Sequence, residues 1–340
     1  MTVPIVRLGA TCLALAAMFG VGACASTPEP QPTPTPVSSA TTSPTPEAMV
    51  VRPGDKPPTV FDGDCDAAVP TSDLTEVVGA SVVLRSSEST GDTGNVGGLS
   101  CAWNGDGGMV TVEMLPLSGL NGVAFPADQQ GYYFEDCDPS WVCSWAGETD
   151  ELWIATSFQL STDMTREAVD GWGSEIAEAV DVNFSASAPI EWERDRSGWW
   201  PVLDCGTVAR QLEEALGDAW TGEPSGYPDP PRPGSVMAAL ASQRSSCLLT
   251  SSDPAVRQIE LYASAGTAWT LPASPDDQEV DSGVPGIAAW EDSQFASVDA
   301  VGYALTDGVN AMQLYLPTGG PSSASELLTA FAGLAASGWE

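Results

Sequence analysis

Two stretches of this sequence decide its fold: CDAAVPTSDLTEVVG at residues 65–79 and CGTVARQLEEALG at residues 205–217. Each begins with a cysteine, carries apolar residues at helical spacing and ends in glycine, which is typical of an amphipathic helix with a glycine stop. A second cysteine follows 36 positions later in the first case, at Cys101, and 42 positions later in the second, at Cys247. Alternating patterns then predict strands over residues 109–115 and 256–263. Because the same order of elements recurs, we expect two copies of one module in tandem.

The two predicted copies also end alike. In the first, a strand is predicted over residues 152–160 and a helix over 165–180, with candidate N-caps at Ser161, Thr162 and Asp163. The apolar face of that helix is Val169, Trp172, Ile176 and Val180. In the second, strands over 298–305 and 309–316 flank Asp307-Gly308, which indicates a type I′ hairpin. A helix is predicted after Pro321, Ser322 and Ser323, and its stripe is Leu327, Leu328, Phe331 and Leu334.

These elements predict an α+β fold: a tandem repeat of two modules, each an antiparallel sheet covered by helices and stapled by disulfides. The polar stretch over residues 185–197 fits a boundary between the modules. We therefore expect a lipoprotein signal peptide at 1–23, a lipid anchor and disordered Pro/Thr/Ser-rich linker at 24–58, a first module at 59–187 and a second module at 198–340.

Six cysteines lie in the predicted modules, and an even number in a secreted chain indicates disulfides. They are Cys65, Cys101, Cys137, Cys143, Cys205 and Cys247. Six cysteines allow fifteen pairings, so their count alone does not choose among them. The internal repeat favours Cys65–Cys101 and Cys205–Cys247, and it leaves Cys137–Cys143 as a local clip in the first copy.

The first 24 residues indicate where the protein resides. Arg7 supplies a positive charge, and the apolar stretch that follows is shorter than the about 20 residues of a spanning helix. Val21-Gly22-Ala23-Cys24 places small residues before a cysteine, like a bacterial lipobox, where the chain is cut after Ala23 and Cys24 receives diacylglycerol. The alternative is an ordinary secretory signal with an unrelated cysteine. We expect lipidation of Cys24 and stable anchoring on the outer, extracytoplasmic face of the cell membrane.

A linker rich in Pro, Thr and Ser follows the predicted anchor, up to about residue 58. Proline lacks an N–H donor and fixes φ, which favours an extended polyproline II spacer without a core. At about 3.1 Å per residue the linker reaches at most roughly 100 Å. Its hydroxyl side chains also suit O-glycosylation, the alternative being a plain solvated linker.

The composition excludes several classes of function. The chain has 46 Asp and Glu, 11 Lys and Arg and no His, a formal net charge of −35. Nucleic-acid binding and electrostatic docking on anionic lipid are not expected, because both need basic residues. Without histidine there is no His-based triad, no histidine general base and no His-ligated metal site. An apolar share of 43% with 12 Trp is too rich for a disordered chain.

The lipobox, the Pro/Thr linker and the order Cys65, short helix, Gly79 and Cys101-Ala102-Trp103 resemble secreted cell-envelope lipoproteins of actinobacteria that carry a paired-cysteine α+β domain. An Arg to Lys ratio of 10 to 1 suits a GC-rich genome of that kind. The second copy departs from the pattern, with Leu248-Leu249 where the first has Ala102-Trp103. The resemblance implies an envelope location, a function that is not known for the family, and no established catalysis.

Acidic residues give no clear metal or catalytic site. Asp62, Asp64 and Asp66 alternate like the start of a calcium loop, but Ala67 stands where an EF-hand needs glycine. The acidic run over 276–281 is a similar weak candidate. A glycosidase needs only two carboxylates, and no motif singles out a pair. No G-x-S-x-G elbow is present, so we expect no catalytic residue, no metal and no cofactor.

Aromatic residues are the better candidates for binding. Those around the predicted Cys137–Cys143 clip are Tyr132, Tyr133, Phe134, Trp141 and Trp145. Aromatic rings of this kind stack on sugar rings or contact a protein partner, and we predict that Trp141 and Trp145 are binding residues. The alternative is that tryptophans, including Trp199, Trp200 and Trp220 in the second copy, fill the cores. The proline-rich segment 224–233 is either a polyproline II ligand or a stiff loop.

Three functions of different classes remain open. The favoured one is a non-enzymatic binding or interaction module of the cell envelope, which predicts an exposed apolar or aromatic patch. A carrier or sensor of a small or lipidic ligand predicts a concave apolar cavity. A carboxylate-based hydrolase predicts two buried acids that face one cleft. We expect a monomer whose partner is the membrane, through Cys24, together with an envelope protein, glycan or small ligand.

Overall fold

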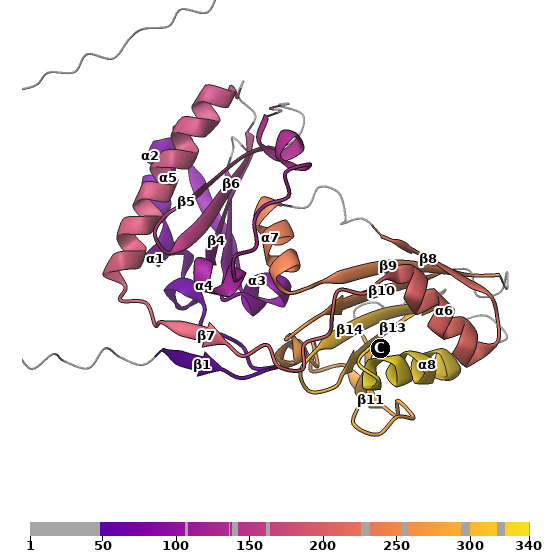
Figure 1. The fold of residues 1–340 in the computed structure, drawn as a ribbon. Coiled ribbons are helices and arrows are strands. Elements are labelled where there is room, and N and C mark those ends of the chain that lie inside the picture. The colour runs from indigo at the N-terminus through magenta and orange to yellow at the C-terminus, as the bar shows by residue number, and fades with distance from the viewer. Residues whose placement is uncertain are drawn as a thin grey trace, which may run out of the picture. The chain divides into compact units, whose positions relative to one another are not determined.

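The computed structural model describes residues 48–105, 108–135, 137, 142–160, 164–225, 232–252, 258–293, 300–317 and 324–339. One compact unit spans Glu47–Glu340. It is a mixed α+β body with two antiparallel sheets and a two-stranded parallel ribbon (Figure 1). Cys24 and the expected signal peptide lie outside the described residues. Within the described part, no helix has the length and apolar character needed to cross a membrane.

The first sheet has five strands in the order β2-β3-β4-β6-β5. They are β2 (Val82–Glu88), β3 (Leu99–Gly105), β4 (Gly108–Pro116), β5 (Cys143–Glu148) and β6 (Leu152–Leu160). One face is covered by α1 (Cys65–Ala68), α2 (Thr71–Val78) and α5 (Arg166–Ala186). Trp103, Phe158 and Leu74 are among the fully buried side chains of the core between these layers. Strands β4 and β6 match the predicted 109–115 and 152–160.

Local chemistry explains where the helices that cover the first sheet begin and end. Asp64 accepts hydrogen bonds from the N–H groups of the first turn of α1, and Pro70 separates α1 from α2. Gly79 ends α2 in the left-handed conformation, as its glycine stop predicts. Helix α5 is capped by Thr165, whose hydroxyl accepts a hydrogen bond from Ala168 N at 3.2 Å. The N-cap is therefore Thr165 and not one of the expected candidates, Ser161, Thr162 and Asp163, which lie outside the described residues.

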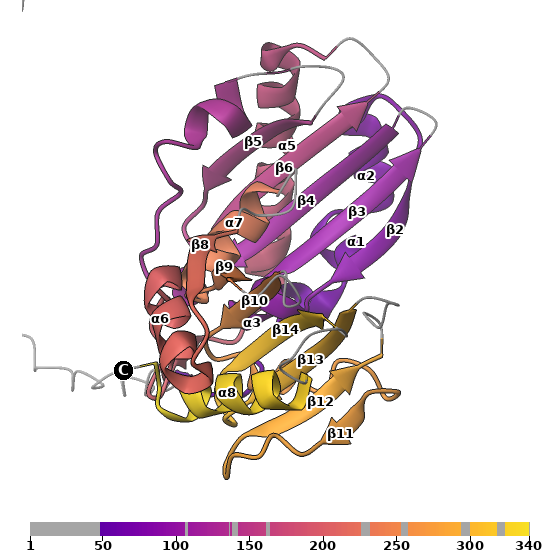
Figure 2. The same ribbon diagram turned by 90° about the vertical axis from the view of Figure 1, so that its right-hand side faces the viewer.

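The second sheet has seven strands in the order β11-β12-β13-β14-β10-β9-β8. They are β8 (Trp220–Pro224), β9 (Ser245–Ser251), β10 (Ile259–Ser264), β11 (Gln278–Val280), β12 (Ala288–Asp292), β13 (Ala300–Thr306) and β14 (Ala311–Pro317). Helices α6 (Cys205–Leu216) and α8 (Ala324–Ala336) pack against one face (Figure 2). The predicted helix over 205–216 is confirmed, including its left-handed stop at Gly217.

The predicted type I′ hairpin at Asp307-Gly308 is wrong. Thr306 pairs with Ala311, so the loop between β13 and β14 has four residues, and only Gly308 in it has positive φ. The Asp307 carboxylate explains the difference, because it accepts hydrogen bonds from Val309 N at 2.8 Å and Asn310 N at 2.7 Å. An aspartate side chain that closes its own turn does not need the mirror-image backbone.

All three expected disulfides are present: Cys65–Cys101, Cys137–Cys143 and Cys205–Cys247. The two long-range bridges occupy the same places, since each joins the first residue of a helix to the third residue of a strand. The strand order β8-β9-β10-β14-β13 also corresponds to β2-β3-β4-β6-β5. Strands β11 and β12 have no counterpart among the described residues of the first sheet.

The folded body begins earlier than the expected linker boundary at residue 58. Strand β1 (Met49–Val51) pairs in parallel with β7 (Trp192–Arg194). Val51 is buried, and burial of this side chain explains why the strand is part of the body. Residues 49–51 are therefore not linker, and the polar boundary segment between the sheets also contains a strand.

The other face of the first sheet carries helix α7 (Pro233–Ala241), which comes from the second half of the chain (Figure 1). Met237, Ala238 and Ala241 pack with Leu115 and Trp153 in a separate apolar cluster. Pro233, expected in a stiff loop, is the first residue of this helix. Helix α3 (Gly91–Asn95) lies beside α7. We call this contact between the two halves the junction.

Polar groups complete the junction. The buried Asn95 side chain donates to Ser242 Oγ at 3.0 Å and to Ala265 O at 2.8 Å, and its Oδ1 accepts from Arg194 Nη2 at 2.9 Å. Arg244 pairs with Asp92 at 3.0 Å. Although the chain has only 11 basic residues, four arginines contact groups at the junction: Arg194, Arg196, Arg232 and Arg244.

Candidate binding sites

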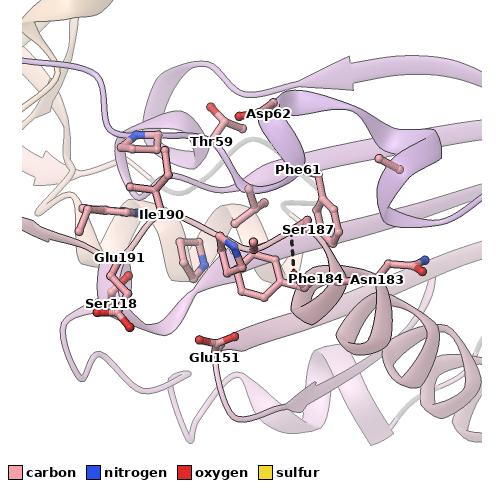
Figure 3. Close-up of a pocket in the computed structure, with 18 of the residues that line it drawn as sticks. Thr59, Phe61, Asp62, Ser118, Glu151, Asn183, Phe184, Ser187, Ile190 and Glu191 are labelled. Atoms are coloured by element: carbon pink, nitrogen blue, oxygen red, sulfur yellow. Dashed lines mark hydrogen bonds between the residues drawn. The ribbon is translucent and has the colours of Figure 1, made fainter. Parts of the chain in front are cut away.

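A groove of about 970 Å³ opens beside the first sheet, next to the end of α5 (Figure 3). Its walls come from four segments that are far apart in sequence: residues 58–67, 116–118, 150–151 and 183–192. They include the 3₁₀ turn η1 (Val60–Gly63), the start of α4 (Leu117–Leu120), the β5–β6 turn and the end of α5. In Figure 3, Thr59 and Asp62 lie on one side of the groove and Glu151 on the other.

Backbone contacts hold these walls in place. Val60 N donates to Gly97 O at 3.0 Å, and Leu117 N donates to Glu151 O at 2.9 Å. Gly97 has φ +73°, and a Cβ there would lie 2.7 Å from the Trp192 ring. Glycine is therefore required at this position for two walls to approach each other. On the helix side, the Asn183 side chain donates to Ala68 O at 3.0 Å and joins α5 to α1.

The floor of the groove is apolar. Phe61 and Phe184 meet edge to face, with ring centroids 5.5 Å apart, and both are buried. Trp192 is buried beside them, whereas Ile190 is 61% exposed although it is a large aliphatic residue. An exposed isoleucine next to buried aromatic rings gives the groove an apolar surface that is open to a ligand.

The rim of the groove is acidic. Five carboxylates line it, and no Lys or Arg is among its described lining residues. They are Asp62, Asp64, Asp150, Glu151 and Glu191. Asp64 also caps α1, because its Oδ1 accepts from Asp66 N at 2.9 Å. A concave site with carboxylates of one sign attracts cations and disfavours anions.

Three residues in the groove have a backbone conformation that L-residues rarely adopt. Phe61 and Asp62 both have φ 53°, and Ala188 has φ 50°. The left-handed region costs a non-glycine residue roughly 1–2 kcal/mol. Strain of this kind persists where the surroundings impose it, and it is concentrated at ligand-binding and switch regions. It therefore marks the groove as a candidate site independently of its shape.

The acidic residues considered for metal binding have structural roles. Asp66 accepts from Thr71 Oγ1 at 2.8 Å, and Asp277 accepts from Ser293 Oγ at 2.9 Å. Asp281 accepts from Gly283 N at 2.9 Å. Among the described residues, no group of three or more Asp, Glu or Cys is arranged to hold a metal ion.

A second pocket, of about 520 Å³, contains Trp145. Trp141, the other expected binding residue, lies outside the described residues. Trp145 is half-buried and packs partly against the core, as does Trp172 of α5. Of the neighbouring aromatics, Tyr132 is 56% exposed and Tyr133 is buried. The alternative of core packing fits Trp200 and Trp220, which are both buried.

The hydrolase hypothesis predicts two buried acids in one cleft, and the structure contains two buried acids among its described residues. Glu113 on β4 and Asp292 on β12 are each at most 3% exposed, and they belong to different sheets. Glu113 contacts helix α7, where Gly234 N donates to it at 2.9 Å. Burial raises the pKa of Glu113, and the hydrogen bonds and nearby Arg232 oppose that shift. These two acids do not face one cleft.

Comparison of the chain with protein-family models, with curated proteins and with solved structures gave no match. The resemblance to actinobacterial lipoproteins therefore stays a prediction. Sequence patterns alone did not reveal the groove. Asp62 and Asp64 attracted attention only as possible metal ligands, and Phe184, Ile190 and Glu191 gave no signal. A glycine at 97 and an isoleucine next to Pro189 become informative only when the four segments are brought together.

Proposed function

We propose that this protein is a lipoprotein anchored by Cys24 to the outer face of the cell membrane, and that its body is a non-enzymatic binding module of the cell envelope. The lipobox-like sequence before Cys24 supports the anchor. Three disulfides support an oxidising, extracytoplasmic compartment. The Pro/Thr-rich stretch, which we propose is disordered, would let the body reach a partner away from the membrane.

The groove carries the functional part of this proposal. Its apolar floor of Phe61, Phe184 and Ile190 suits aliphatic or aromatic groups, and its five carboxylates suit ammonium or guanidinium groups. A ligand that satisfies both is cationic and partly apolar. We propose that the partner presents such a segment, with Lys or Arg side chains next to apolar ones. The net charge of −35 would speed the encounter with a basic partner.

We further propose that the body consists of two copies of one module. The matching strand orders and the matching positions of Cys65–Cys101 and Cys205–Cys247 support a duplication. Along the chain, helix α3 connects β2 to β3 and helix α7 connects the corresponding strands β8 and β9. The two helices pack against each other. On this view the copies have diverged, since the described residues that line the groove lie between positions 58 and 192.

A carrier or sensor of a small cationic amphiphile is the second candidate. The volume of about 970 Å³ favours it, because this is near the upper end of ordinary ligand pockets. The same groove and the same charges would bind this ligand. The two candidates differ in whether the cation is part of a protein partner or part of a lipid-like molecule.

Titration calorimetry of the body, residues 47–340, tests the proposal. The probes are a hexapeptide of alternating Lys and Leu, its Glu/Leu counterpart and decylammonium. We expect the Lys/Leu peptide to bind and the Glu/Leu peptide not to bind. A double substitution, Glu151→Gln with Glu191→Gln, should weaken binding about tenfold, as loss of two partly screened charge pairs implies. The matched control is Glu213→Gln with Glu214→Gln on α6, which should leave the affinity unchanged.

Three results would decide against parts of this proposal. Equal binding of the two peptides would refute charge recognition. Equal loss of affinity in both double variants would show a general effect of net charge rather than a site. Binding of decylammonium without binding of the Lys/Leu peptide would favour the carrier over the interaction module.

A further inference from the structure

The second pocket lies at the edge of the first sheet, where β5 is the last strand. It shares no lining residue with the acidic groove. Its lining combines four aromatic side chains with polar ones. The aromatic side chains are Phe125, Phe134, Trp145 and Trp153, and the polar ones include Arg166 and Asp170.

Aromatic rings make one wall of this pocket. The Phe125 ring centroid lies 5.0 Å from that of Phe134 and 6.2 Å from that of Trp153. The Phe125 and Trp153 rings are nearly parallel, at 7°. Trp153 is buried against the junction, which fixes its position, whereas Phe125 and Phe134 are half-buried. The wall is thus an apolar surface on which ring atoms of Phe125 and Phe134 are partly accessible.

Trp145 contributes from the other side of β5, and two glycines make room for it. A Cβ at Gly173 would lie 2.4 Å from the Trp145 ring, and a Cβ at Gly147 would lie 2.5 Å from its outer edge. Because both positions lack a side chain, the indole lies between α5 and its own strand. Its placement is fixed by packing, yet the side chain stays half-exposed toward the pocket.

The polar groups of the pocket are also held in place. Arg166 Nη2 and Nε donate to Asp170 Oδ1 at 2.6 and 3.0 Å. Arg166 Nη1 donates to Phe134 O at 2.8 Å and Ser144 O at 2.7 Å. The carboxylate of Asp170 is therefore oriented by an arginine that is itself fixed to two backbone carbonyls. Gln130 and Glu148, both exposed, add an amide and a second carboxylate at the opening.

Addition of a peptide strand to the edge of β5 is disfavoured by the same contacts. The carbonyl of Ser144, which an added strand would need, already accepts from Arg166. The short π-helix η2 (Gly131–Glu135) also lies beside β5. What remains is a compact pocket with aromatic faces and with both donors and acceptors around them.

We infer that this pocket binds a pyranose ring of an envelope glycan. The C–H face of a sugar would lie on the aromatic rings, as apolar groups stack on π-systems. Its hydroxyl groups would donate to the carboxylates of Asp170 and Glu148 and bond with the Gln130 amide. A neutral sugar leaves the Arg166–Asp170 ion pair intact, and its hydroxyl groups can donate to the other carboxylate of the pocket, Glu148. A volume of about 520 Å³ accommodates a ligand of this size.

Saturation-transfer NMR on the body, with N-acetylglucosamine trimer, maltotriose and mannotriose as probes at millimolar concentration, tests this inference. We expect saturation of ring C–H protons in at least one probe. Trp145→Phe, which keeps an aromatic core residue, should weaken its affinity about tenfold. Asp170→Asn should weaken it at least as much. The matched control, Tyr303→Phe on β13, changes an aromatic residue of the second sheet that does not line the pocket, and it should leave the affinity unchanged.

The inference is overturned if none of the three sugars binds, or if binding survives both pocket substitutions in folded protein. Displacement of the sugar by the Lys/Leu peptide would also overturn it, since this would indicate a shared peptide site. The acidic-groove variant, Glu151→Gln with Glu191→Gln, should bind the sugar normally. The outcome for the pocket is therefore independent of the outcome for the groove.

Discussion

Glu113, in the middle of β4, accepts a hydrogen bond through Oε2 from the backbone N–H of Gly234, in the first turn of α7, at 2.9 Å. Its Oε1 accepts from Ser235 Oγ at 3.2 Å. One buried carboxylate on the first sheet thus satisfies an N–H that the helix cannot satisfy itself. This hydrogen bond joins the two halves of the chain through residues 121 positions apart.

Burial of the Glu113 carboxyl at this contact should make the stability of the protein depend on pH. Burial raises the pKa of Glu113 above its unfolded value of about 4.3. The folded state therefore holds the proton more tightly, so the contribution of Glu113 is fully present below the unfolded pKa and is lost as the pH rises through the folded pKa. Glu113→Gln stays neutral. Its Tm relative to wild type should rise as the pH is raised above the unfolded pKa of about 4.3. A flat or falling difference in thermal unfolding scans would contradict this.

The closeness of α7 to β4 gives a second prediction. A Cβ at position 234 would lie 2.6 Å from Glu113 Cβ. Gly234→Ala should therefore lower the free energy of unfolding by about 1–3 kcal/mol, through overpacking. The control is Gly171→Ala on α5, where a Cβ meets nothing within 4 Å. That substitution should raise stability by about 0.5–1 kcal/mol. Denaturant titrations that give both variants the same sign would refute tight packing at the junction.

The disulfides should contribute to stability according to the length of the loops that they close. Loop entropy gives about 4 kcal/mol for the separations of 36 and 42 residues, and about 2 kcal/mol for the separation of 6. Replacing Cys65 and Cys101 with Ala should therefore destabilise the protein more than replacing Cys137 and Cys143. Urea unfolding of the two double variants measures this. The reverse order would show that strain or residual structure outweighs loop entropy.

Backbone strain in the groove is testable at Ala188, which has φ 50°. Ala188→Gly should raise the free energy of unfolding by about 1 kcal/mol, since glycine adopts this conformation without steric cost. Ala186→Gly, at the end of α5, is the matched control and should lower it by about 0.5–1 kcal/mol. Equal destabilisation by the two variants would show that Ala188 is not strained in solution.

Much of the fold was predictable from local patterns. The cysteine-led helices, their stops at Gly79 and Gly217 and strand β6 follow from periodicity and turn chemistry, and the repeat supplied the disulfide pairing. Helix α7 was not predictable as a junction element. Val236, Met237, Ala238 and Ala239 are apolar without a polar face, so the pattern gives no direction of packing. The four-residue loop at Asp307 was not predicted, because hydrogen bonds to the Asp307 carboxylate close the turn in place of a type I′ backbone.

The candidate sites were less predictable than the fold. Trp145 was identified because aromatic residues gather in sequence around the Cys137–Cys143 clip. The acidic groove joins Phe61, Glu151 and Ile190 from separate segments, and none of these residues has a local signal of function. A site built by tertiary contacts between turns is visible only once those turns are placed.

Hydrogen–deuterium exchange, with and without the Lys/Leu hexapeptide, tests the central claim most directly because it locates binding as well as detecting it. We predict slower exchange in residues 58–64 and 183–192, which form the groove, and unchanged exchange in α6 and α8. At the same peptide concentration, protection should be weaker in the Glu151→Gln, Glu191→Gln variant, as a tenfold lower affinity implies. Protection confined to other segments, or no protection at a peptide concentration that gives calorimetric heat, would contradict the assignment of the groove as the binding site.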